Sequence, residues 1–158
     1  MQVQLTQEER KVLEDQKKHE EVCIQKYDQY SQQASDPQLK NMFSQFASQE
    51  RQHHETLSQL LQGQQPSTGG GSGQGQQQSR PAVQNSGQNQ RGSAGQDDAL
   101  MCQDAMMMEK FISDSYDNGI FASTNPTVRQ ALQHIQDEEQ EHGEGLLNYL
   151  QNHGLQSS

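Results

Sequence analysis

The stretch His134-Ile-Gln-Asp-Glu-Glu-Gln-Glu-His142-Gly-Glu144 contains a Glu-x-x-His pair, formed by Glu139 and His142. Residues three positions apart lie on one face of a helix, one turn from each other, so this carboxylate and this imidazole can point at the same place. The same pair occurs once more, as Glu50-Arg-Gln-His53. Both residues of the pair recur at one offset, since 139 − 50 and 142 − 53 are both 89. This common offset indicates an internal repeat.

The offset of 89 positions holds without a gap from about residue 13 to about residue 62 of the first copy. Identical residues recur at the matched positions: Glu20 and Glu109, Tyr27 and Tyr116, Pro37 and Pro126, Leu57 and Leu146. Apolar residues within each copy recur at steps of three and four, which is typical of helices that pack in a bundle. The sequence therefore predicts an all-α fold, a four-helix bundle made of two repeated helical hairpins.

A tract of low complexity separates the two copies. Only 28% of the 158 residues are hydrophobic, a low share for a globular protein. Part of this deficit lies in residues 63–98, where Val83 is the only large apolar residue among Gly, Gln, Ser, Asn and Pro. Such a tract cannot bury enough surface to offset the entropy cost of ordering, so we predict a disordered linker. The hairpins at residues 1–62 and 99–158 then share one core, because each is small for independent stability.

The linker is long enough to cross from one end of the bundle to the other. About 36 flexible residues have a root-mean-square reach of roughly 33 Å, and a helix of about 25 residues is roughly 38 Å long. We therefore expect the second and third helices to run parallel. The same slack would let two chains exchange hairpins, so a swapped homodimer is an alternative to the monomer.

Composition excludes several classes of function. The formal net charge of −10 at pH 7 argues against binding to nucleic acid or to an anionic membrane surface. The sequence shows neither a long apolar run nor a basic, apolar N-terminus, so we expect no membrane span and no signal peptide. Cys23 and Cys102 occupy apolar positions of helical patterns and are interpreted as buried core thiols, in keeping with a cytoplasmic protein.

Local signals place the ends of the helices. Thr6-Gln-Glu-Glu9 is typical of a capping box at the start of the first helix. Asp36 and Pro37 supply an N-cap and a first helical residue for the second helix, and Thr124-Asn-Pro126 repeats this break in the second copy. We expect Asp97 or Asp98 to cap the third helix.

The inward-facing stripes of the four helices include six ionisable residues: Glu20, Glu50, His53, Glu109, Glu139 and His142. An unpaired buried carboxylate is costly in free energy, and four of them facing one another would repel strongly. One Glu from each of two helices and a Glu-x-x-His from each of the others are the ligands of a carboxylate-bridged di-metal centre. We therefore predict two divalent metal ions, iron or manganese, with zinc permitted. In the alternative, the six residues form buried salt bridges without metal, or the helices splay to hydrate them.

Tyr27 and Tyr116 each lie two helical turns after the inward glutamate of their own helix. We expect core aromatic side chains whose hydroxyls are satisfied by a carboxylate. The alternative is a hydrogen bond that supports a metal-ligating glutamate, or a redox-active tyrosine. The adjoining Asp28 and Asp117 are expected to be solvated, and the alternative for them is a hydrogen bond to a Glu-x-x-His histidine.

The second half of the chain, residues 104–154, resembles the spore coat F family of endospore-forming bacteria. The resemblance rests on Tyr116-Asp-Asn-Gly-Ile-Phe121, on Asn125-Pro126, on the stretch from His134 to Gly143, and on Tyr149-Leu-Gln-Asn-His-Gly154. It implies a ferritin-like bundle, made in the sporulating cell and deposited in the spore coat with other coat proteins. It implies little chemistry, because members of the family need not keep the metal ligands.

Two functions stay open on this basis. The first is a structural role as a coat component. The second is an enzyme, since the wider ferritin-like group includes rubrerythrins and manganese catalases, which turn over peroxide. The chain lacks the Cys-x-x-Cys iron module of rubrerythrins, and Ile112 stands where they tend to carry an extra carboxylate. A ferroxidase or peroxide-scavenging activity would therefore need an outside reductant, or a catalase-like cycle that needs none.

Overall fold

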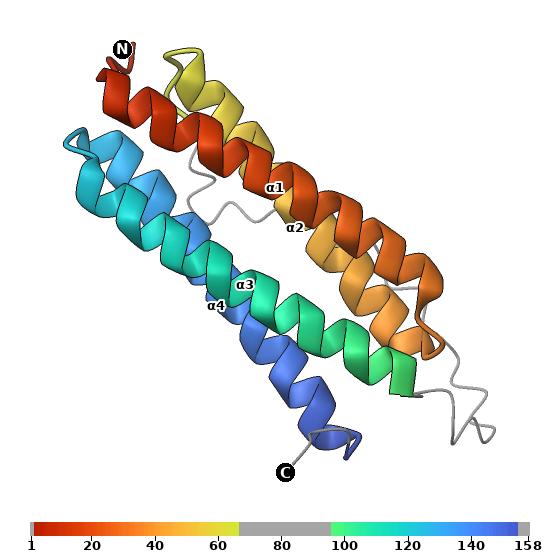
Figure 1. Cartoon of the computed structure of the whole chain (residues 1–158). Helices are drawn as coiled ribbons and strands as arrows, with labels where there is room; N and C mark the ends of the chain where they lie inside the picture. Colours follow the sequence, from red (N-terminus) through yellow and green to blue (C-terminus); the bar gives the residue numbers. More distant parts are fainter. Residues whose placement is uncertain (1, 67–95, 155–158) are drawn as a thin grey trace.

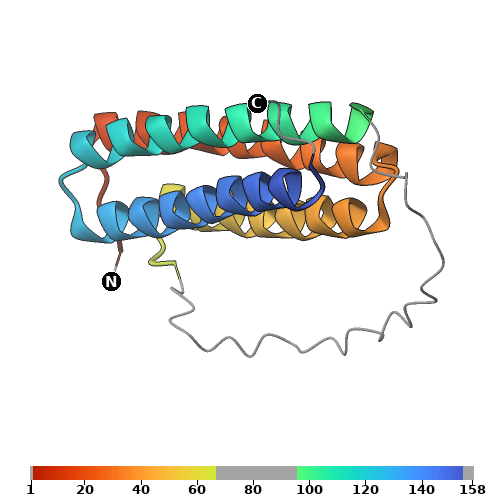
Figure 2. The ribbon, with the colours of Figure 1, turned by 90° about the horizontal axis from the view of Figure 1, so that it is seen from below.

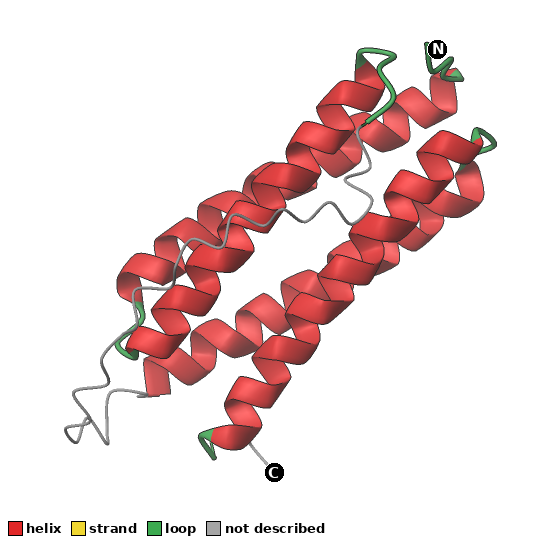
Figure 3. Cartoon of the chain, turned by 180° about the vertical axis from the view of Figure 1, so that it is seen from behind, coloured by secondary structure: helices red, strands yellow, loops and turns green. Residues whose placement is uncertain are grey.

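The computed structural model describes residues 2–66 and 96–154 and contains four long helices. They are α1 (Gln7–Gln33), α2 (Pro37–Leu61), α3 (Gln96–Ala122) and α4 (Pro126–Asn152). The remaining described residues form loops and turns (Figure 3). α1 packs against α2, and α3 packs against α4, so the predicted all-α fold of two helical hairpins is confirmed. The disorder predicted for the linker falls mainly on residues 67–95, which lie outside the described part of the chain.

The two hairpins pack on each other through α1 against α3 and α2 against α4. In Figure 1, α2 and α3 run in the same direction, as the long crossover predicts. Figure 2 shows α1 and α3 as one layer, with α2 and α4 as the other. Each helix therefore has antiparallel neighbours on two sides. No helix in the described segments is long and apolar enough to cross a membrane.

The starts of α1, α2 and α4 agree with the predicted capping signals. Thr6 Oγ1 accepts a hydrogen bond from Glu9 N at 3.0 Å, and Glu9 Oε2 accepts one from Thr6 N at 2.9 Å, which completes the capping box. Asp36 and Asn125 cap α2 and α4, each accepting a bond from the backbone N–H two residues later. These side chains satisfy amide groups that would otherwise lack a partner at a helix start.

The start of α3 differs from the prediction. The helix begins at Gln96, inside the stretch expected to belong to the linker, and Asp97 and Asp98 lie in its first turn rather than before it. The prediction that either aspartate is the N-cap is therefore wrong. Asp98 is instead fully buried, and its carboxylate accepts hydrogen bonds from the first hairpin.

Asp98 and Glu9 each tie one hairpin to the turn of the other. Asp98 accepts hydrogen bonds from the backbone N–H groups of residues 35 and 36, at 2.9 Å and 3.0 Å. Glu9 Oε1 accepts them from those of residues 124 and 125, at 2.8 Å and 2.7 Å. Glu9 and Asp98 are 89 residues apart, and so are their respective partners in the two turns. The repeat therefore extends upstream of residue 13, where the sequence comparison placed its start. The matched contacts relate the hairpins by an approximate two-fold axis.

The core consists of two apolar clusters, one toward each end of the bundle. On α2, Phe43 belongs to one cluster and Leu57 to the other; on α4, Leu146 and Leu132 divide in the same way. The positions midway between these residues carry the predicted glutamates, so a polar layer separates the two apolar ones. The two cysteines, which were predicted to be core thiols, are buried and free.

Candidate metal centre

The six predicted ligands meet in the polar layer at the middle of the bundle. α1 and α3 each contribute one glutamate, while α2 and α4 each contribute a Glu-x-x-His pair. The six residues, each no more than 3% exposed, are Glu20, Glu50, His53, Glu109, Glu139 and His142. The fold thus brings together every residue of the predicted site, from all four helices.

These residues form two overlapping groups. Ligand atoms within 4.8 Å of one another come from Glu20, Glu50, His53 and Glu139 in one group, and from Glu50, Glu109, Glu139 and His142 in the other. Glu50 and Glu139 belong to both groups, so their carboxylates are placed to bridge two ions. Each group then adds one further glutamate and one histidine. This is the arrangement that the sequence predicts for a di-metal centre, and the ligand roles themselves stay a prediction.

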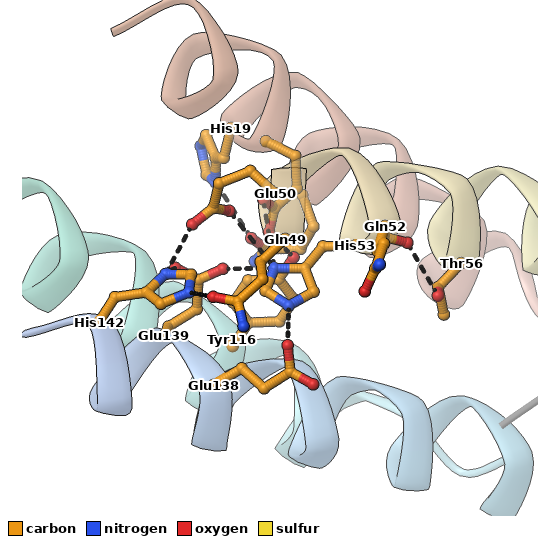
Figure 4. A network of polar contacts seen from close by, with 12 residues as sticks. His19, Gln49, Glu50, Gln52, His53, Thr56, Tyr116, Glu138, Glu139 and His142 are labelled. Carbon is orange, nitrogen blue, oxygen red and sulfur yellow. Dashed lines mark hydrogen bonds and ion pairs between the residues drawn. The ribbon is translucent and has the colours of Figure 1, made fainter. Parts of the chain in front are cut away.

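Both histidines direct Nδ1 toward the carboxylates (Figure 4). His53 Nδ1 lies 2.8 Å from Glu139 Oε1 and 3.3 Å from Glu50 Oε2. His142 Nδ1 lies 2.9 Å from Glu50 Oε1 and 3.4 Å from Glu109 Oε1. Nδ1 is therefore the ring atom that would bind a metal ion in each case.

The other ring nitrogens are held by residues that sequence reasoning missed. His53 Nε2 donates to Glu138 Oε2 at 2.8 Å, and His142 Nε2 donates to Gln49 Oε1. An oxygen acceptor at Nε2 keeps the proton there and leaves the lone pair of Nδ1 free for a metal. Gln49 and Glu138 are themselves 89 positions apart, and each precedes a histidine of its own helix by four. That spacing is the sequence signal that could have identified both residues. It does not give their partners, because each residue bonds the histidine of the other hairpin.

The two buried tyrosines also reach across the repeat. The Tyr27 hydroxyl donates to Glu109, and the Tyr116 hydroxyl donates to Glu20. The predicted carboxylate partner is confirmed. That the tyrosines support metal-ligating glutamates, or are redox-active, stays a prediction. The partner glutamate belongs to the opposite hairpin because α1 and α3 pack antiparallel.

Asp28 does not bind a histidine of the centre. It forms an ion pair with Arg51 on α2, while Glu138 occupies the place behind His53. Asp117 is exposed, as predicted. The alternative in which these aspartates bond the histidines is therefore wrong for Asp28, because Glu138 of α4 bonds His53 Nε2 instead.

Several buried polar atoms of the centre have no hydrogen-bond partner among the described residues. They are Glu20 Oε2, Glu50 Oε1, Glu109 Oε2, both Glu139 carboxylate oxygens and His142 Nδ1. Some of them lie at ion-pair distance from each other, but without the geometry of a hydrogen bond. Unsatisfied groups at this depth are costly in free energy. All of them belong to residues of the two groups, as expected for the donor set of a metal site.

The electrostatics of the layer also call for positive charge. Burial raises the pKa of Glu50 well above its usual value, and the neighbouring Glu20 adds to this effect. Burial likewise raises the pKa of Glu139, with a further increase from Glu109. Burial lowers the pKa of His53, but its hydrogen bonds to carboxylates outweigh that effect and raise it overall. The layer therefore gathers protons or metal ions, and two divalent cations would balance its four carboxylates.

The second hairpin matches a known family. Residues 97–157 match the Coat F domain, a stretch that includes Glu109, Glu139 and His142 but none of the first hairpin. No curated protein and no solved structure matched the chain. The resemblance expected from the sequence of the second half is confirmed. Residues 97–157, which include almost all of the second hairpin, are therefore similar to the Coat F domain.

Proposed function

We propose that this protein is a spore coat-associated, ferritin-like protein that holds two divalent metal ions, iron or manganese, in its central polar layer. Glu50 and Glu139 would bridge the ions, Glu20 and His53 would complete one position, and Glu109 and His142 the other. Imidazole and carboxylate ligands suit both metals. The observation that carries the proposal is the sharing of two carboxylates between two groups of four buried ligands.

The proposed place in the spore coat rests on the Coat F domain of the second hairpin. We propose that the protein is made in the sporulating cell and assembles with other coat proteins. A tagged protein should then be found in the coat fraction of purified spores. Its recovery only in the mother-cell extract would contradict this part of the proposal and leave the metal centre untouched.

A second candidate function is a di-metal oxidoreductase. Two adjacent iron or manganese ions supply electron transfer to dioxygen or peroxide when they are bound. In the oxidation of ferrous iron by dioxygen, ferrous iron supplied from outside as the substrate is the reductant. Disproportionation of peroxide to water and dioxygen needs no other reductant. The buried tyrosine hydroxyls beside Glu20 and Glu109 favour this candidate, because they orient the two terminal carboxylates.

The first test is the metal content of the protein purified without added metal, measured by elemental mass spectrometry. We expect about two iron or manganese ions per chain, and we expect them to be lost in the variant Glu50→Ala/Glu139→Ala. Glu141→Ala, which alters an exposed carboxylate on the same helix, is the matched control. A wild-type protein that folds but binds neither metal would exclude the centre. Absence of turnover with peroxide, or with ferrous iron and dioxygen, would exclude the enzyme alone.

A further inference from the structure

A pocket of about 370 Å³ opens between α3 and α4 and reaches the polar layer. Its floor is formed by Glu109 and Glu139, two of the predicted ligands. Both side chains are buried, at 2% and 0% exposure, and both present carboxylate oxygens without a hydrogen-bond partner. Two residues that line the pocket thus carry buried carboxylate oxygens without a hydrogen-bond partner among the described residues.

The mouth of the pocket is acidic. The exposed residues Asp114 and Glu144 lie on it, one from each helix, with Lys110 as its one described cationic residue. In a chain with a formal net charge of −10, carboxylates at an opening raise the local concentration of cations. The path from mouth to floor therefore passes from exposed carboxylates to buried ones.

Gly143 keeps the space between α3 and α4 open. It lines the pocket, and a Cβ atom added at this position would meet only the Cβ of Glu109, at 3.9 Å. The matched position in the first hairpin, 89 residues earlier, carries His54 instead. The His54 side chain bridges α2 and α1, because its Nε2 lies 3.1 Å from Glu21 Oε1. The repeat is therefore broken where the pocket lies.

We infer that the pocket between α3 and α4 is the route by which divalent metal ions enter the centre. Asp114 and Glu144 attract the hydrated cation, the missing side chain at Gly143 gives it passage, and Glu109 and Glu139 receive it. At the matching position of the first hairpin, His54 and Glu21 span the space between α2 and α1. This inference rests on the proposed metal centre and adds the side from which the ions reach it.

The test is the rate of Co²⁺ uptake by the metal-free full chain, followed by the absorbance of the bound ion after rapid mixing. Gly143→Leu places a side chain in the pocket without a backbone clash and replaces a poor helix former with a good one. We expect the uptake rate to fall at least about tenfold, with the final amount of bound Co²⁺ unchanged. His54→Leu, the same side chain at the matched position of the first hairpin, should leave the rate unchanged.

A second variant tests the route without filling it. Asp114→Asn/Glu144→Gln removes two charges from the mouth, so uptake should slow at low ionic strength and approach the wild-type rate at high salt. Glu8→Gln/Glu14→Gln, which removes two exposed carboxylates elsewhere, is the charge-matched control.

The outcomes separate the route from the centre. Equal uptake rates in wild type, Gly143→Leu and the mouth variant would overturn the route while the metal centre stands. Failure of the folded wild type to bind Co²⁺, iron or manganese would overturn both. Slower uptake to the same end point in both variants, with both controls unchanged, would support the route.

Discussion

Glu138 of α4 holds His53 of α2 through a 2.8 Å contact between Oε2 and Nε2, whereas the matched contact to His142 uses the amide oxygen of Gln49. A carboxylate behind a histidine makes the imidazole a stronger donor to a metal than an amide does. Glu138 Oε1 also lies 2.7 Å from Nε2 of the exposed His134. The two halves of the centre, which share their ligand types, therefore differ in the charge behind the histidine.

This difference predicts that the two ions bind with unequal affinity, the tighter one at the His53 position. Glu138→Gln should weaken binding there by about 10–100-fold and bring the two affinities closer together. Isothermal titration of the metal-free protein with Mn²⁺ would resolve the two steps. Glu141→Gln, a neighbouring exposed carboxylate, should leave both steps as in the wild type. Identical titrations for Glu138→Gln and the wild type would refute the asymmetry.

Metal binding should raise the free energy of unfolding, because the ions bind the folded chain and relieve the repulsion among four buried carboxylates. At a free metal concentration 100 times the dissociation constant, the gain is about 2.7 kcal/mol for each bound ion. Urea denaturation with Mn²⁺ and with a chelator would measure it. Glu50→Gln/Glu139→Gln should abolish the response to metal while leaving the metal-free protein at least as stable as the wild type. A chelator effect of equal size in this variant would point to metal bound elsewhere.

The hydroxyl of Tyr27 should contribute to stability through its bond to Glu109 in the other hairpin. In Tyr27→Phe a buried carboxylate oxygen loses its partner, which costs about 1–3 kcal/mol. Denaturation of the metal-free protein would measure the loss. Tyr30→Phe is the control, because its hydroxyl bonds Asp104, whose side chain is 43% exposed and can turn to water. An equal loss of unfolding free energy in the two variants would contradict the claim that the bond to a buried carboxylate contributes more than the bond to an exposed one.

The carboxylate of Glu9 should make stability depend on pH. Burial raises its pKa, but hydrogen bonds from the backbone N–H groups of Thr6, Asn125 and Thr124 outweigh this and hold the pKa below its usual 4.5. The contribution is therefore complete above pH 4.5 and is lost as the pH falls through the lowered pKa of the folded state.

Glu9→Gln should accordingly lower the free energy of unfolding by about 1–3 kcal/mol at pH 7, with a smaller loss below pH 4.5. Denaturation curves of both proteins from pH 7 to pH 3 would show this convergence. Glu8→Gln, one residue earlier and exposed, serves as the control. A difference between Glu9→Gln and the wild type that stays constant over this range would exclude the carboxylate as its source.

The helices and the six residues of the polar layer could be predicted from the sequence because both follow from spacing within one helix. Steps of three and four place Glu50 and His53 on the inward face whatever surrounds them. The partners of Tyr27 and His53 could not be predicted in this way, because they depend on how the facing helices run. Asp98 shows the same limit. Its place near a helix start indicated a cap, but its oxygens accept hydrogen bonds from the backbone of the turn in the other hairpin.

The sharing of Glu50 and Glu139 between both groups of ligands means that neither hairpin holds a complete centre. A chain with only one such hairpin would have to associate with a second copy about a two-fold axis to bring the same groups together. Its site would then be lost when the dimer dissociates on dilution. Joining two copies in one chain replaces that bimolecular encounter by an effective local concentration set by the linker. Fusion also allows the two halves to diverge in sequence. At matched positions of the repeat, His54 corresponds to Gly143 and Gln49 corresponds to Glu138. Two identical subunits could not differ in this way.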